Sequence, residues 1–246
     1  MSKIELDSNL INKIYQFLTK LKVVKYSTMI GVIIYSGAIC VGSIVAFVYG
    51  GTLQGPGTYS IFTNYISDMG SFNYTPMPFI LDFGCMLTSF FLIPSLFYLK
   101  KRLNPLPQNE EDLKDKSSKK LGLGKILCNI GFIFMIIGLI GMFGVGLFSE
   151  DRTTSLDLHW IFTIVVFNGF AFTSFFYGLV ICFYSEKIPK ILGLYMFITP
   201  IVMIIILFGF GFQPFHEWLT FFVLLGWMIP LSIIFLKEIN EELRRT

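Results

Sequence analysis

Six apolar runs dominate the sequence, and each is long enough to cross a lipid bilayer as one α-helix. A hydrocarbon core of roughly 30 Å needs about 20 helical residues at a rise of 1.5 Å per residue. The runs are residues 28–49, 79–99, 125–148, 159–184, 191–212 and 217–236. Because 54% of the residues are apolar and only 14% are charged, the solvent for most of the chain must be lipid. We therefore predict an all-α integral membrane protein in which residues 28–246 form a single domain, a bundle of six transmembrane helices.

The basic residues predict the orientation of these helices. Of the 19 Lys and Arg residues, 18 fall in segments that the six runs place on one side of the membrane, and only Arg152 falls on the other. Because loops rich in Lys and Arg stay in the cytoplasm, we predict a multi-pass protein of the cell membrane with both termini cytoplasmic. In residues 1–27, apolar side chains recur at helical spacing between lysines, which predicts an amphipathic helix on the inner membrane surface.

The two longest loops differ in composition. The inner segment 104–120 mixes prolines, acids and lysines, a composition that buries almost nothing, and it is predicted to be a mobile linker. The outer segment 50–78 combines Gly and Pro turns with many aromatic residues, and we expect it to fold onto the helix ends.

Glycines and cysteines in the apolar runs are interpreted as packing residues. The third run carries a stripe of glycines, which lets a membrane helix approach the backbone of a neighbour. Its members are Gly124, Gly131, Gly138, Gly141 and Gly144. The four cysteines fall one in each of the first four runs without a CxxC pair, which indicates small buried side chains rather than metal ligands.

Ionisable and polar residues gather at the predicted outer ends of the helices. Asp82 lies about one turn inside the second run, where an unpaired carboxylate is costly, so we expect it to have a partner. The candidates are His159, His216 and the polar groups of the outer loop. Helix amino ends that point outward also favour carboxylates and bound anions. We predict a ligand-binding site formed by Asn64, Ser67, Asp68, Asp82, His159, His216 and Glu217.

Other charged residues on this face have simpler interpretations. Glu150, Asp151 and Arg152 are typical of a solvated turn. Ser155 and Asp157 suit the start of the fourth transmembrane helix as capping residues.

The segment NYISDMG, residues Asn64 to Gly70, carries a family resemblance. The chain resembles the uncharacterised DUF-nine-nine-eight family of prokaryotic membrane proteins. It is similar, more weakly, to the DRAM/Frag/Sfk membrane family, whose members carry a comparable Ile-Ser-Asp-x-Gly loop. Ser67, Asp68 and Gly70 match that motif. A second signature is matched at Gly146, Phe148, Glu150, Asp151 and His159, with Ser149 standing where a proline is expected. The resemblance implies a six-helix bundle and no established reaction.

Two functions of different classes fit these residues. The first is a non-enzymatic membrane protein, surrounded by lipid and needing no cofactor, whose outer pocket binds a small polar ligand or a lipid headgroup. The alternative is a zinc-dependent intramembrane hydrolase acting on a lipid or an amide, with Asp82 or Asp68, His159 and His216 as zinc ligands. The chain departs from the alkaline ceramidase and progestin-receptor-like pattern, because it has two histidines rather than three and six apolar runs rather than seven.

Two further classes are disfavoured. Ion or proton transport calls for acidic groups deep in the bundle, and beyond Asp82 the apolar runs offer none. Nucleic-acid binding is not expected, because topology and anionic lipid account for the basic inner face. The ligand and the oligomeric state stay open.

Overall fold

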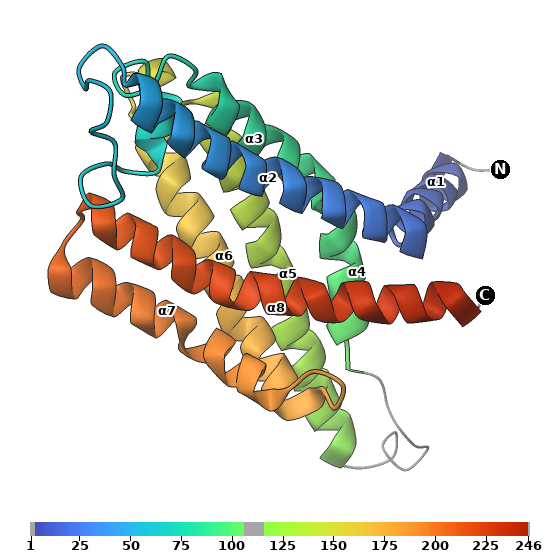
Figure 1. Cartoon of the computed structure of the whole chain (residues 1–246). Helices are drawn as coiled ribbons and strands as arrows, with labels where there is room; N and C mark the ends of the chain where they lie inside the picture. Colours follow the sequence, from blue (N-terminus) through green and yellow to red (C-terminus); the bar gives the residue numbers. More distant parts are fainter. Residues whose placement is uncertain (1–2, 106–115, 246) are drawn as a thin grey trace.

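The computed structural model describes residues 3–105 and 116–245, and every long element in them is an α-helix (Figure 1). The helices are α1 (Lys3–Leu18), α2 (Leu21–Tyr49), α3 (Phe79–Phe91), α4 (Ile93–Leu103), α5 (Lys116–Leu147), α6 (Leu158–Tyr184), α7 (Lys190–Phe210) and α8 (Pro214–Arg245). Two short 3-10 helices, η1 (Ser67–Gly70) and η3 (Glu150–Arg152), lie in the loops after α2 and α5. The all-α prediction is confirmed for these residues.

Five helices in the described residues are individually long and apolar enough to cross a membrane, and α3 with α4 makes a sixth span if the two are counted together. The prediction of one continuous helix over 79–99 is wrong, because α3 and α4 meet at Leu92 with a bend of 42°. Pro94 has no backbone N–H, so it cannot donate to the carbonyl of Phe90 and the helical hydrogen-bond pattern is interrupted there.

Several predicted boundaries also move. Residues 106–115 of the predicted linker 104–120 lie outside the described residues, whereas Lys116 already belongs to α5, so the predicted end of the linker is wrong. The last helix continues past residue 236 to Arg245, and Arg102 of α4 forms an ion pair with Glu238 at 2.7 Å on this extension. Residues Lys3–Leu18 of the leader form α1, and α2 begins at Leu21, seven residues before the predicted start of the first span. The place of α1 on a membrane surface stays a prediction.

The glycine stripe of α5 packs against α6, as predicted. A Cβ atom added at Gly141 would lie 2.5 Å from the backbone nitrogen of Val166, and one added at Gly169 would meet the backbone of Gly138. Backbones this close exclude any larger side chain. The α5–α6 pair is the most intimate helix contact of the described bundle, and α7 packs on α6 and α8.

The outer loop 50–78 folds onto one end of the bundle, as predicted. Asn64, Asp68, Ser71 and Thr75 in this loop are all buried. Both termini lie at the opposite end of the bundle (Figure 1). The loop therefore closes one end of the bundle, where most of the predicted site residues are found.

Candidate functional site

Asn64 organises the outer loop. Its side chain is almost fully buried, and the Oδ1 atom accepts hydrogen bonds from the Gln54 side chain, the Ser60 backbone and the Thr63 hydroxyl at 3.0–3.2 Å. Its Nδ2 atom donates to Gln54 Oε1 at 2.6 Å and to Asp68 Oδ2 at 3.0 Å. Because the amide is fully engaged, Asn64 shapes the loop and offers no group to a ligand.

The first turn of α8 fastens this loop to the bundle. Trp218 Nε1 donates to the backbone oxygen of Asn64 at 2.9 Å, and both groups are buried. Glu217 Oε2 accepts from the backbone N–H of Ile66 at 3.0 Å. Glu217 is only 9% exposed, so losing this hydrogen bond would leave buried polar groups unsatisfied. The loop motif and α8, about 150 residues apart in sequence, thus form one unit.

Asp68 and Glu150 form a carboxyl pair between η1 and η3. Burial raises the pKa of Asp68, while hydrogen bonds from Asn64 and from the backbone of Tyr65 act against that rise. Burial also raises the pKa of Glu150 to about 7, and the negative charges of Asp68 and Asp151 add to the effect. The Oε2 atom of Glu150 is buried and has no hydrogen-bond partner among the described residues. At neutral pH a large share of the Glu150 carboxyl is therefore protonated.

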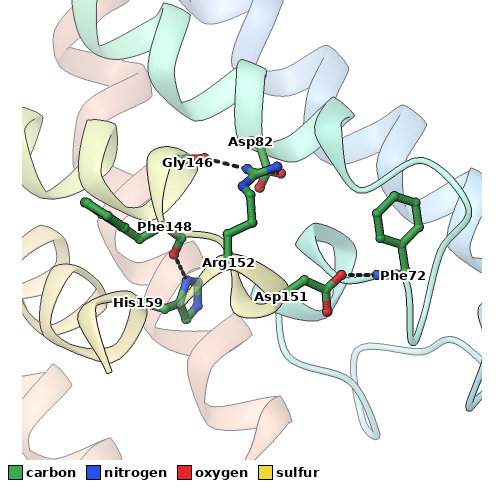
Figure 2. A network of polar contacts seen from close by, with 7 residues as sticks. All are labelled: Phe72, Asp82, Gly146, Phe148, Asp151, Arg152 and His159. Atoms are coloured by element: carbon green, nitrogen blue, oxygen red, sulfur yellow. Dashed lines mark hydrogen bonds and ion pairs between the residues drawn. The ribbon is translucent and has the colours of Figure 1, made fainter. Parts of the chain in front are cut away.

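Arg152 is the partner of Asp82 (Figure 2). Its Nη2 atom lies 2.7 Å from Asp82 Oδ2 and 3.1 Å from the backbone oxygen of Gly146. Asp82 is 3% exposed, whereas the Arg152 side chain is 52% exposed. The predicted partners of Asp82, a histidine or a polar group of the outer loop, are therefore not the one that the structure shows. Asp151 and Arg152 are exposed, as expected for a solvated turn, but Arg152 also holds Asp82. The signal for this pair was in the sequence, because Arg152 is the one basic residue on the predicted outer face.

Asp151 also belongs to this docked turn. Its carboxylate accepts a hydrogen bond from the Ser71 hydroxyl at 2.7 Å and from the Phe72 backbone N–H at 2.5 Å (Figure 2). Since Ser71 and Phe72 follow η1, Asp151 holds part of the outer loop.

Neither histidine forms a hydrogen bond or an ion pair with Asp68, Asp82, Glu150 or Asp151 in the described part of the chain. His159 Nδ1 is hydrogen-bonded to the backbone oxygen of Phe148 at 2.8 Å (Figure 2), and His216 Nδ1 to that of Gly211 at 2.8 Å. Among residues 3–105 and 116–245, no three His, Cys, Asp or Glu side chains are grouped so that they could hold a metal ion. The suggested zinc ligands Asp82, His159 and His216 are therefore not brought together. That the protein needs no cofactor stays a prediction.

The start of α6 is capped differently from the prediction. Asp157 adopts a left-handed backbone conformation with φ of 52°, and its side chain makes no capping hydrogen bond. Thr153 takes this role, because its hydroxyl accepts from the backbone N–H of His159 at 3.3 Å and donates to Asp157 at 3.2 Å. Ser155 lies exposed in the turn before the helix.

A cavity of about 450 Å³ runs through the bundle beneath the outer loop. It is bounded by α2, α3, α4, α5, α6 and α8, and it forms where α8 makes few contacts with α2 and α6. Ser67 and Glu217 line its outer end together with Tyr35, and Ile239 lines its inner end. Tyr35 was not anticipated, because its helix is apolar on most sides and the sequence does not mark which side faces inward.

The structure thus sorts the predicted site residues into three groups. Asn64, Asp68 and Glu217 meet at the outer loop, and Ser67 and Glu217 reach the cavity. Asp82 pairs with Arg152 beside a second, smaller hollow of about 250 Å³. His159 and His216 contact only backbone groups through their Nδ1 atoms, away from Asp82.

Comparison with known proteins identifies one family. Residues 28–236 match the Frag1/DRAM/Sfk1/Cwh43P N-terminal domain, which covers most of the chain. This match confirms the resemblance to the DRAM/Frag/Sfk membrane family, whereas the resemblance to the DUF-nine-nine-eight family is not part of it and stays a prediction. No curated protein and no solved structure matches the chain.

Proposed function

We propose that this chain, which belongs to the Frag1/DRAM/Sfk1 family of membrane proteins, binds a membrane amphiphile without catalysing a reaction on it. In this proposal the polar head of the ligand lies beneath the outer loop at Glu217 and Ser67. The apolar part occupies the cavity between α2 and α8.

One observation carries the proposal, the cavity that joins a polar outer end to an apolar interior. Its volume of about 450 Å³ falls in the range of roughly 300–1,000 Å³ that is typical of small-molecule sites. Most of the lining side chains are aliphatic or aromatic, and Glu217 is the one Asp, Glu, Lys, Arg or His among the described residues that line it. A site with one ionisable group at one end and a mostly apolar lining beyond it suits an amphiphile.

The outer polar cluster supports binding rather than hydrolysis. Asn64, Asp151 and the two histidines are hydrogen-bonded to backbone groups or to the Gln54 side chain, and Asp82 is paired with Arg152. Such groups stabilise the loop above the cavity, and they are not arranged around a common point where a water molecule could be activated.

The distribution of Lys and Arg along the chain supports a cellular location and a membrane orientation for the protein. We propose a multi-pass protein of the cell membrane whose termini are both cytoplasmic, which places the outer loop and Glu217 on the extracytoplasmic side. The concentration of Lys and Arg in the terminal and inner segments supports this orientation, as does the position of both termini at one end of the bundle (Figure 1).

Native mass spectrometry of the protein purified in a mild detergent tests the proposal. Ser232 lines the cavity, so Ser232→Phe should fill part of it and remove a bound lipid that the wild-type protein retains. Ile205→Phe is the matched control, because Ile205 is 57% exposed and does not line the cavity. Equal lipid retention by the two variants would refute the proposal.

A further inference from the structure

We infer that the bound amphiphile has a single hydrocarbon chain and a head group that donates hydrogen bonds and carries no negative charge. A long-chain alcohol or amine has this chemistry. The inference rests on the proposed function and specifies the ligand class of that same cavity.

The outer end of the cavity offers acceptors. Glu217 uses Oε2 to accept from Ile66, and no described residue donates to its other carboxyl oxygen. Tyr35 and Ser67 line the same end, and within the described part of the chain their hydroxyls make no hydrogen bond. The carboxyl oxygens can accept hydrogen bonds, and a hydroxyl can donate or accept. A head group with a hydrogen-bond donor supplies the partner that the second carboxyl oxygen of Glu217 lacks among the described residues.

Electrostatics at this end disfavours an anion. Among the described residues that line the cavity there is no Lys or Arg to pair with a negative head group. Beyond Glu217, the nearby Asp68 and Glu150 add further carboxyl groups. A negatively charged head group would find no cationic partner at this end, and a buried charge without a partner is costly.

The dimensions of the cavity suit one chain. From Glu217 to Ile239 along α8 is roughly 33 Å at the helical rise of 1.5 Å per residue. An apolar slot of this length and volume suits one extended alkyl chain.

The ligand reaches this slot from the bilayer. Residues of α2 and α8 that line the cavity are also exposed on the lipid-facing surface, namely Met29, Val32, Ile33, Ile229 and Ile233. Because α2 and α8 make few contacts with each other, the slot opens between them toward lipid. The alkyl chain of the ligand can therefore enter the cavity laterally from the lipid without crossing a polar barrier.

Tryptophan fluorescence gives a test in nanodiscs of zwitterionic lipid. Trp227 lines the cavity and is 2% exposed, and Trp218 is 3% exposed, so bulk lipid does not contact either one. With Trp160→Phe as the background, the buried tryptophans alone report on the cavity. Chain-brominated alcohol, amine and carboxylate of equal length are compared at equal mole fraction in the membrane at pH 8. We expect the alcohol and the amine to quench, with the carboxylate at least tenfold weaker.

Variants test whether Glu217 and Tyr35 cause the preference for the alcohol and the amine over the carboxylate. Glu217→Gln keeps the acceptor for Ile66 and should lower amine affinity at least tenfold, whereas Glu186→Gln, an exposed residue outside the cavity, should leave it unchanged. Tyr35→Phe removes only the hydroxyl and should weaken both ligands about threefold or more.

Three outcomes separate the hypotheses. Equal quenching by all three ligands would overturn the head-group inference and leave the proposed function standing. Stronger quenching by the carboxylate would overturn the inference outright. No quenching by any ligand would overturn both the inference and the proposed function. A melting temperature within 2 °C of the background protein shows that a variant is folded.

Discussion

Replacing Arg152 by Gln should destabilise the protein through Asp82 rather than through the lost arginine contacts. Asp82 is 3% exposed, and Arg152 at 2.7 Å is its one ion-pair or side-chain hydrogen-bond partner among the described residues. Breaking a fully buried ion pair costs about 3–5 kcal/mol. Arg152 is 52% exposed, so solvent already weakens the pair, and we expect a loss of about 2 kcal/mol.

The assay is thermal unfolding of the purified protein in detergent. At about 2–4 °C per kcal/mol for a chain of this size, Arg152→Gln should lower Tm by about 4–8 °C. Asp82→Asn keeps the shape and removes the charge, so adding it to Arg152→Gln should recover about half of this loss. Arg244→Gln is the control, because Arg244 is exposed in the last turn of α8. If Arg152→Gln and Arg244→Gln shift Tm equally, the reasoning is wrong.

Three further predictions concern other parts of the bundle. Because the pKa of Glu150 is raised to about 7, the folded protein binds this proton more tightly than the unfolded chain does. The free energy of unfolding should therefore fall as pH rises from about 4.5 to 7. Melting curves recorded across this range should show a flatter dependence for Glu150→Gln. Gly131→Leu should lower Tm by at least 5 °C, because a Cβ at Gly131 would lie 2.6 Å from an aromatic ring of α6. Gly122→Leu should lower Tm by less than 2 °C, because a Cβ at Gly122 would meet open space. Equal shifts in Tm would contradict the packing role of the glycine stripe. With the natural cysteines replaced, a cysteine at Thr58 should react with an impermeant label in intact cells and one at Glu186 only after the membrane is opened, whereas the reverse pattern would invert the topology.

The sequence was sufficient for the membrane class and for much of the packing. Apolar runs of bilayer length predict spans because lipid leaves few alternatives for the backbone. The glycines of α5 predict a close helix contact because they recur along one side of a single helix. The composition of the loop after α2 predicts that this loop is partly buried. Each of these predictions depends on residues that are near one another in the chain.

The site could be predicted only in part, because its contacts join distant segments. Asp82 and Arg152 are 70 positions apart, and Glu217 is 151 positions from Ile66. Such pairs depend on how each helix is rotated about its axis. A transmembrane helix that is apolar on all sides gives no amphipathic signal for that rotation. For the same reason the cavity and Tyr35 were missed, although Ser67, Asp68 and Glu217 were predicted to share one end of the bundle, as they do in the structure.

The bend between α3 and α4 shows a different limit. Pro94 was visible in the sequence, but prolines are tolerated inside membrane helices when neighbouring groups satisfy the freed carbonyl. Composition alone does not say whether such a helix kinks or continues straight. Here it bends at Leu92, and the inner half then reaches Glu238 through Arg102.

Photo-crosslinking with a chain-labelled alcohol tests the central claim most directly, because it reports where an amphiphile lies. A diazirine in the middle of the chain, activated in membranes and mapped by peptide mass spectrometry, should label the cavity-lining stretch of α8 around Trp227 and the facing residues of α2 near Tyr35. Excess unlabelled alcohol should abolish this labelling, whereas labelling of the lipid-facing surface of α7 at Ile204 and Phe208 should persist. Labelling confined to lipid-facing residues, or labelling of the cavity that excess alcohol does not reduce, would contradict the account.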